Sequence, residues 1–247
     1  MRVTVLELPA RWGDPEGALR LVSGVLAEGP ATDLVLLPEA SLSGYVSPRG
    51  DFDLTPHAET AGGPTSRAIA ELARRHHTVV VAPLVLREGT CVWNAMVAFD
   101  DRGELLFTYR KRHPWIPETW ATPGTDALPV VHIVDTTVTI CICYDVHFVS
   151  SEMGPALDAS DLLLFPSAWV DDSPRDLRDA LLPRLARRHR IAVANANWAR
   201  GVVAVPGQGR SRILDAAGVE LVRVDDAARA HGEIGRIDAV VVPSARA

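Results

Sequence analysis

Three residues of different chemistry lie where short apolar runs of the sequence end. Glu39 and Lys111 each follow one such run, and Cys143 is the last residue of a third, 138–143. Short apolar runs bounded by polar residues predict buried strands. If these strands lie side by side, we expect all three side chains to converge at one edge of a sheet.

A thiol, a carboxylate and an ammonium group together are sufficient for acyl transfer. A cysteine thiol with a pKa of about 8.5 needs a base or a nearby cation to act as a nucleophile at neutral pH. Glu39 can take the thiol proton, while Lys111 and the backbone N–H of Tyr144 can stabilise the oxyanion. Each residue alone also fits a structural role: a small core residue for Cys143, a turn acid for Glu39 and a surface cation for Lys111.

The elements that must position these residues alternate along the chain. A helix opens at Asp14, with a proline in its first turn. Further helices are predicted from 65 to 76 with Thr65-Ser66 as the cap, from 151 to 160 with a break at Gly154-Pro155, and from 173 to about 188. Strands are predicted at 3–8, 33–38, 78–86, 91–99, 104–109, 130–134, 138–143, 162–165, 191–195, 212–214, 219–224 and 233–238. The order predicts one α/β domain with a layered sheet core, over residues 1–247.

The composition narrows the class of protein. Of 247 residues, 47% are hydrophobic and the net charge is −6, which favours a globular core and disfavours a nucleic-acid partner. No run approaches the roughly 20 apolar residues of a membrane span, and the N-terminus lacks the apolar region of a signal peptide. Three cysteines make no disulfide framework, and no CxxC or HxxxH pair predicts a metal. We therefore expect a cytoplasmic protein without a membrane partner.

Three stretches of the sequence closely resemble the signatures of the nitrilase superfamily of carbon–nitrogen hydrolases, in matching order and spacing. They are Leu37-Pro38-Glu39, Tyr109-Arg110-Lys111-Arg112-His113 and Ile142-Cys143-Tyr144-Asp145-Val146-His147-Phe148. The resemblance extends from Met1 to about Asp238. It implies a four-layer αββα sandwich that pairs into homodimers or larger homo-oligomers, and it implies no cofactor.

The resemblance also implies a role for each central residue. Cys143 would be the nucleophile, Glu39 the general base and Lys111 the stabiliser of the intermediate. Glu118 falls where these enzymes often carry a second glutamate, which would hold Lys111 or assist proton transfer. The alternative for Glu118 is an acid in a loop beside a proline.

The sequence departs from the amidase-like pattern at three places. His147 stands where an arginine is usual, Val149-Ser150 replaces a Pro-Glu pair, and 185–189 replaces an Arg-Ala…Glu-Asn pattern. These changes leave the substrate and the assembly contacts open. The Cys-Tyr-Asp order nevertheless resembles the amidase-like branches more than true nitrilases.

Aromatic residues in predicted loops and at strand ends are candidates for the pocket wall, with packing as their alternative role. The predicted substrate-binding residues are Tyr45, Trp115, Tyr144, His147 and Trp169. Arg200 is a candidate partner for a substrate carboxylate. We expect a small linear amide as substrate. An N-carbamoyl amino acid, a nitrile, acyl transfer to an amine and a scaffold without turnover stay open as alternatives.

Overall fold

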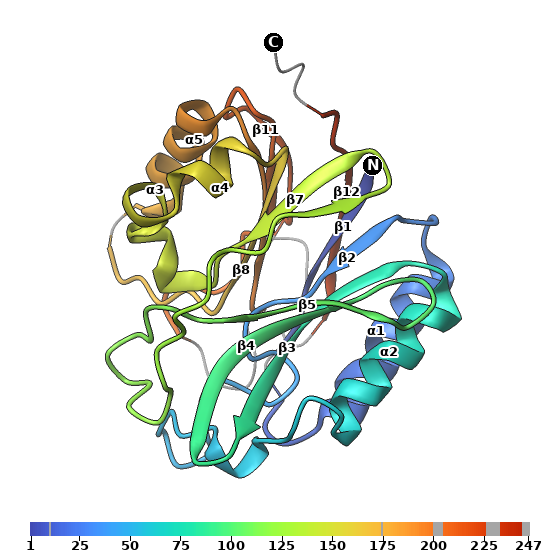
Figure 1. Cartoon of the computed structure of the whole chain (residues 1–247), viewed down its shortest axis with the longest axis vertical. Coiled ribbons are helices and arrows are strands. Elements are labelled where there is room, and N and C mark those ends of the chain that lie inside the picture. Colours follow the sequence, from blue (N-terminus) through green and yellow to red (C-terminus); the bar gives the residue numbers. More distant parts are fainter. Residues whose placement is uncertain (10, 174, 200–204, 226–232, 244–247) are drawn as a thin grey trace.

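Two six-stranded sheets face each other in the computed structural model, which describes residues 1–9, 11–173, 175–199, 205–225 and 233–243. Figure 1 shows α1 and α2 on the outer side of the first sheet, and α3, α4 and α5 on the outer side of the second. The arrangement is the predicted αββα sandwich.

The first sheet has the strand order β12-β1-β2-β3-β4-β5. Its strands are β1 (Arg2–Glu7), β2 (Leu34–Leu36), β3 (Val79–Glu88), β4 (Cys91–Phe99), β5 (Leu105–Arg110) and β12 (Gly235–Val240). The three strands β1, β2 and β3 run parallel, while β4, β5 and β12 pair antiparallel to their neighbours. The covering helices are α1 (Pro15–Glu28) and α2 (Pro64–His76), and a short 3-10 helix, η1 (Thr55–His57), lies in the loop before α2.

The second sheet has the order β11-β10-β9-β8-β7-β6. Its strands are β6 (Val131–Ile133), β7 (Thr136–Ile140), β8 (Leu162–Ser167), β9 (Ala192–Asn197), β10 (Arg212–Leu214) and β11 (Glu220–Arg223). The central strands β7, β8 and β9 are parallel. The 3-10 helix η2 (Cys143–His147) follows β7 and leads into α3 (Val149–Glu152) and α4 (Gly154–Asp158), while α5 (Arg178–His189) precedes β9.

The strands of the first sheet are apolar at successive positions because both of their faces are covered. In β3, Val79 and Val81 pack into the core between the sheets, while Val80 and Ala82 pack against α1 and α2. Side chains alternate between the two faces of a strand, so a strand buried on both faces needs an unbroken apolar run.

Most predicted elements are present, and β4 has the predicted bounds 91–99. The strand predicted to end at Cys143 ends at Ile140, because the Ile142 N–H bonds to the Asp145 side chain instead of continuing the ladder. The helix predicted from Ser173 begins at Arg178, because the Asp171 carboxylate accepts from the Ser173 and Leu177 N–H groups and holds this stretch as a loop.

Two further predictions concern helix ends. The predicted break near Gly154 is confirmed, since two short helices, α3 and α4, occupy that region. The capping of α2 by Thr65 and Ser66 is wrong. The helix begins one residue earlier, and the Glu59 carboxylate accepts from the backbone N–H groups of both residues.

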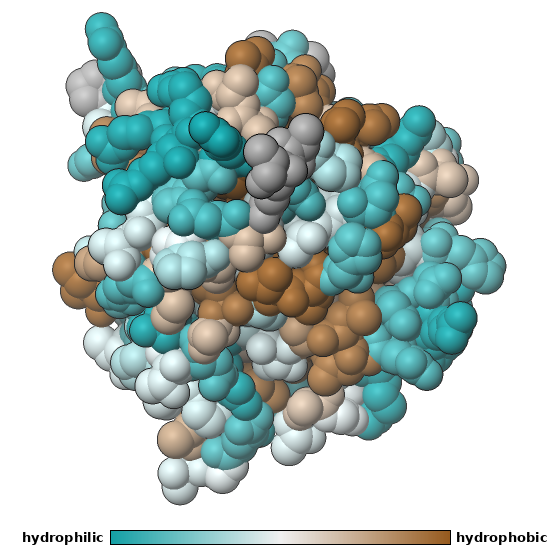
Figure 2. All heavy atoms as spheres, turned by 45° about the horizontal axis from the view of Figure 1, so that its top comes forward, coloured by the Kyte–Doolittle hydropathy of each residue, from teal (hydrophilic) through white to brown (hydrophobic). Residues whose placement is uncertain are grey.

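On the face drawn in Figure 2, apolar side chains gather near the middle and hydrophilic side chains lie around them. Within the described ranges, no helix combines the length and apolar character that crossing a membrane requires.

Candidate active site

The three candidate residues do meet, but between the sheets and not at one edge of a single sheet. Glu39 follows β2 and Lys111 follows β5, and these strands are separated by β3 and β4. Cys143 follows β7 in the opposite sheet. The prediction that their strands lie side by side is therefore wrong, because the facing of two sheets brings the side chains together.

Glu39 is 1% exposed, and both of its carboxylate oxygens accept hydrogen bonds. Its Oε1 accepts from Asn94 Nδ2 at 2.8 Å and from Lys111 Nζ at 2.7 Å. Its Oε2 accepts from the backbone N–H of Ala168 at 2.8 Å. Partners from β4, from the loop after β5 and from the end of β8 therefore fix the orientation of this carboxylate.

Lys111 is fully buried and lies between two carboxylates. Its ammonium donates to Glu39 Oε1 at 2.7 Å and to the two oxygens of Glu118 at 2.7 and 3.0 Å. Burial acts to lower the pKa of Lys111, but the charges of Glu39 and Glu118 outweigh it and raise the pKa above its ordinary value. The lysine is therefore a permanent cation at neutral pH.

Glu118 is buried and joins the lysine to the aromatic side of the site. Its Oε1 also accepts from Tyr45 Oη at 2.8 Å, and its Oε2 from the Trp115 backbone N–H at 3.3 Å. Burial and the nearby Glu39 raise the pKa of Glu118, while Lys111 lowers it, and the net direction is upward. Glu118 is therefore not only an acid in a loop beside a proline, because it belongs to the buried charge cluster with Glu39 and Lys111.

Cys143 is 7% exposed and has a φ of +42°, in the left-handed region that a residue with a side chain seldom adopts. Burial and the charge of Glu39 raise the pKa of its thiol, against the opposing effect of Lys111, and Glu118 raises it further. The Ala168 N–H, which bonds to Glu39, also favours the thiolate. With two carboxylates and one ammonium around it, the Cys143 thiol keeps its proton at neutral pH.

Sequence reasoning missed three residues that hold this cluster. Asn94 and Ala168 donate to Glu39 as described, and Asp145 accepts from groups on both sides of the site. An asparagine within the apolar strand β4 is a usable signal in the sequence. Ala168 had none, because its contribution is a backbone N–H.

Two of the predicted pocket residues, Tyr45 and Trp115, donate hydrogen bonds to Glu118. The buried Tyr45 ring packs edge-on against Phe52 and Trp198, with centroids 5.5 and 5.4 Å apart, and Trp115 contacts Phe52 at 5.8 Å. Tyr45 thus reaches Glu118 from an aromatic group formed by Tyr45, Phe52, Trp115 and Trp198.

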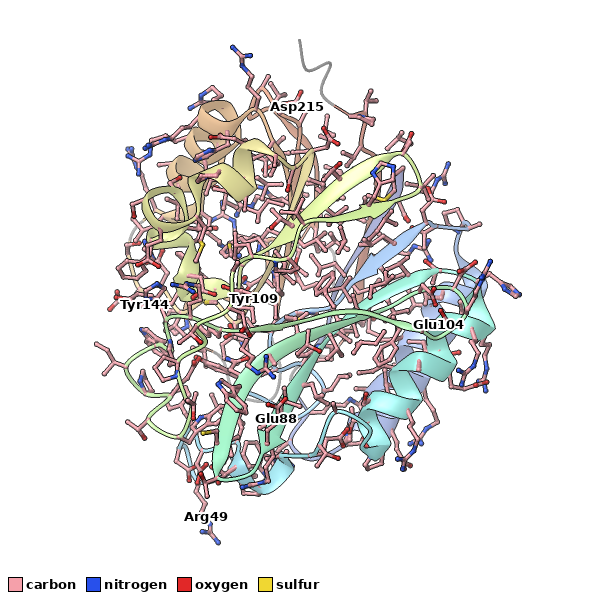
Figure 3. All side chains as sticks on the ribbon, in the orientation of Figure 1. Arg49, Glu88, Glu104, Tyr109, Tyr144 and Asp215 are labelled. Atoms are coloured by element: carbon pink, nitrogen blue, oxygen red, sulfur yellow. The ribbon has the colours of Figure 1, made fainter. Side chains whose placement is uncertain are left out.

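On the other side of the site, the ring of the exposed His147 lies 5.2 Å from Tyr144 and 5.8 Å from the buried Trp169. Burial of part of the His147 ring lowers its pKa, so the imidazole is neutral at pH 7. Figure 3 shows Tyr144 near the periphery of the molecule and Tyr109 in its interior. Arg200 lies outside the described residues.

Metal ions in proteins are held by groups of His, Cys, Asp or Glu side chains. Within the described ranges, no three His, Cys, Asp or Glu side chains are grouped as they would be to hold an ion. The chemistry that the arrangement offers is proton transfer between Cys143 and Glu39 beside a fixed cation, Lys111.

Known proteins share this architecture. The family model for carbon-nitrogen hydrolase matches residues 2–236. The "Hydrolase in pqqF 5'region" of Pseudomonas protegens is 29% identical over 254 residues, which cover 100% of this chain and 86% of that protein. The (R)-stereoselective amidase of a Pseudomonas species is 25% identical over 194 residues, covering 78% of this chain and 69% of the relative.

Two solved structures show the same fold. An amidase from Nesterenkonia sp. superposes with a TM-score of 0.80 at 24% identity, covering 98% of this chain and 90% of that one. A CN-hydrolase superfamily protein from Xanthomonas campestris gives a TM-score of 0.78 at 24% identity, covering 99% and 91%. With the family model matched over nearly the whole length, the chain belongs to the carbon–nitrogen hydrolase family and is a hydrolase of non-peptide carbon–nitrogen bonds.

Proposed function

We propose that the protein is an amidase that cleaves a small linear amide to a carboxylate and ammonia, with Cys143 as nucleophile, Glu39 as general base and Lys111 as stabiliser of the intermediate. The observation that carries this proposal is the buried contact of Lys111 with both Glu39 and Glu118, beside a cysteine in a strained turn. A permanent cation next to a base and a nucleophile is the arrangement that acyl transfer needs.

The reaction follows from the proton balance of the site. The Cys143 sulfur attacks the amide carbonyl carbon while its proton passes to Glu39, and the oxyanion is stabilised by Lys111 and the Tyr144 backbone N–H. When the intermediate collapses, the C–N bond breaks and ammonia leaves with the proton from Glu39. Water then attacks the thioester with Glu39 as base, which releases the carboxylate and restores the thiol.

In this proposal Glu118 holds Lys111 and, through its raised pKa, can exchange a proton with the amide nitrogen. Tyr45, Trp115, Tyr144, His147 and Trp169 form the substrate surroundings. Support comes from the aromatic contacts of Tyr45 and Trp115 on one side and of His147 and Trp169 on the other.

An amide is favoured over the other carbon–nitrogen substrates because the Cys143-Tyr144-Asp145 order resembles the amidase-like branches. The relatives that match most of this chain include both an amidase and a probable nitrilase, so they do not decide between these substrates. An N-carbamoyl amino acid would release carbon dioxide as well as ammonia, and a nitrile would first form a thioimidate. Transfer of the acyl group to an amine would need a pocket that admits the amine in place of water.

The proposal also covers the domain, its assembly and its compartment. Residues 1–247 form a single carbon–nitrogen hydrolase domain, and two or more copies associate through their helices. The described cysteines are all unpaired, which supports work in the reducing cytoplasm. Sedimentation of the purified protein would test the assembly, and a monomer at micromolar concentration would contradict it.

The experiment is an ammonia-release assay over short amides, dicarboxylate monoamides, N-carbamoyl amino acids and nitriles, with Cys143→Ala beside every substrate. Release from the amides that is lost in the variant supports the proposal. Release from nitriles or N-carbamoyl compounds alone would move the substrate to that class. An active Cys143→Ala protein would refute the mechanism.

A further inference from the structure

The nucleophile and the cation of this site belong to different sheets. Lys111 follows β5, the edge strand of the first sheet, and Cys143 follows β7 in the second, and no backbone ladder joins the two strands. Backbone hydrogen bonds within either sheet therefore cannot set the position of the thiol relative to the ammonium. A separate link across the sheets must do so.

The Asp145 carboxylate provides such a link. Its side chain, 2% exposed, accepts from Tyr109 Oη at 2.8 Å and from the Ile142 N–H at 3.1 Å through Oδ2, and from the His113 N–H at 2.8 Å through Oδ1. Tyr109 and His113 lie two residues to either side of Lys111. Ile142 directly precedes the cysteine, so one side chain holds both segments.

The same carboxylate closes the turn that presents the thiol. The Ile142 N–H bonds to the Asp145 side chain, and the Asp145 N–H bonds back to the Ile142 carbonyl at 3.0 Å. These two bonds bracket Cys143 at its unusual φ of +42°. A backbone conformation of this kind persists only where the surroundings hold it.

The chemistry of the link requires an ionised acid. All three partners are donors, and a carboxylate has the acceptor positions for them, whereas a carboxamide would turn an N–H group toward at least one donor. The charges that act most on the Cys143 thiol are those of Glu39, Lys111 and Glu118, so Asp145 acts on the thiol mainly through geometry. Burial raises the pKa of Asp145 itself, and the charge of Lys111 and the hydrogen bonds from His113, Tyr109 and Ile142 oppose that rise.

We propose that Asp145 is the positioning residue of this enzyme, which fixes the Cys143 sulfur relative to the Lys111 ammonium by holding the β5 end and the cysteine turn with one carboxylate. The inference rests on the proposed function, because it matters only if Cys143 and Lys111 act on the same substrate. A misplacement of about 1 Å in such a pair costs on the order of 100-fold in rate.

The test compares three variants in steady-state hydrolysis of whichever of formamide, acetamide and propionamide the wild type cleaves fastest. Asp145→Asn replaces one acceptor oxygen with an NH₂ group, which cannot accept from Tyr109 Oη or from the His113 and Ile142 N–H groups. Tyr109→Phe removes one donor and leaves the two backbone bonds. Thr4→Val removes a partly buried hydrogen bond to Asp238 between β1 and β12, far along the chain from the site, and controls for lost stability. Melting temperature is measured for each.

The expected result is a fall in kcat of about 100-fold in Asp145→Asn with KM within about threefold, because the misplaced groups act on the transition state. Tyr109→Phe should lose about fivefold in kcat, and Thr4→Val should lose melting temperature and no kcat. A folded Asp145→Asn protein with wild-type kcat, or one in which KM rises and kcat does not fall, would overturn the inference.

If Asp145→Asn does not fold, Tyr109→Phe decides: a fall in kcat at constant KM supports the link, and wild-type kcat overturns it. Failure of the wild type to release ammonia from any of the three amides, with the wider panel also silent, would refute the proposed function instead. The two failures are thus distinguishable.

Discussion

Replacing Glu39 with glutamine should make the Cys143 thiol more acidic and the enzyme less active. The charge of Glu39 raises the thiol pKa, so its removal favours the thiolate. The same change removes the proposed base, which would accept the thiol proton. A site that relied on a preformed thiolate would gain activity from this substitution, whereas the arrangement described above must lose it.

The magnitude of the loss follows from the role of Glu39. Positioned general bases contribute about 10²- to 10⁴-fold, or roughly 3–5 kcal/mol, to a rate. Stability should fall by about 3 kcal/mol, because Lys111 loses one of its two carboxylates while Glu118 still compensates its charge. If the NH₂ group of the glutamine takes the place of Oε2, it would also face the Ala168 N–H, so two donors would meet where the native site has a hydrogen bond.

Two assays on one preparation separate these effects. Ammonia release from the best short amide gives kcat, and iodoacetamide labelling followed by peptide mass spectrometry gives the pH midpoint of Cys143 alkylation, with Cys91 as internal reference. We expect lower kcat and a lower alkylation midpoint than in the wild type. An unchanged or higher midpoint would refute the charge argument, and wild-type kcat would refute the assignment of the base.

Three further predictions concern the surrounding contacts. Lys111→Met leaves Glu39 and Glu118 buried without their shared cation, so urea unfolding should show a loss of stability of about 3–5 kcal/mol. The loss should become smaller as the pH falls, because burial already raises the pKa of Glu118 and this carboxyl then protonates; equal losses at pH 5 and pH 8 would contradict this. Asn94→Ala removes a donor to the Glu39 carboxylate, so kcat/KM should fall about tenfold; an unchanged kcat/KM would argue against the contact. The pKa of Asp176 is lowered to about 2, because hydrogen bonds and charges from Arg178 and Arg212 outweigh burial, which raises it. Its contribution to stability is therefore complete above about pH 4 and lost as the pH falls toward 2, and Asp176→Asn should flatten the acid limb of the stability profile.

The fold was largely predictable because the apolar runs and helix caps are local signals. The run 91–99 and the Asp14 cap both appear as predicted, the latter with Asp14 accepting from the Gly17 N–H at 2.8 Å. The errors lie where a partner distant in sequence decides. The Glu59 carboxylate caps α2, and Asp171 keeps the residues before Arg178 from joining α5.

The site was predictable to the extent that its residues stand at strand ends. The sequence places Glu39 and Lys111 correctly beyond apolar runs, and it places Cys143 at the end of a strand that in fact ends at Ile140. It does not say that Cys143 meets the other two from the opposite sheet. The contacts of Asp145 with Tyr109 and His113 depend on that facing and had to come from the structure. Asn94 reaches Glu39 within the first sheet, across the intervening strand β3.

The central claim is that Cys143 carries the acyl group during turnover. Rapid mixing of the wild type with its best short amide, acid quenching and peptide mass spectrometry would detect that adduct directly. The account predicts an acyl group on Cys143, formed at least as fast as ammonia appears and absent from Cys91, Cys141 and the Cys143→Ala variant. Steady turnover with Cys143 unmodified at every time point, or continued turnover in Cys143→Ala, would contradict it.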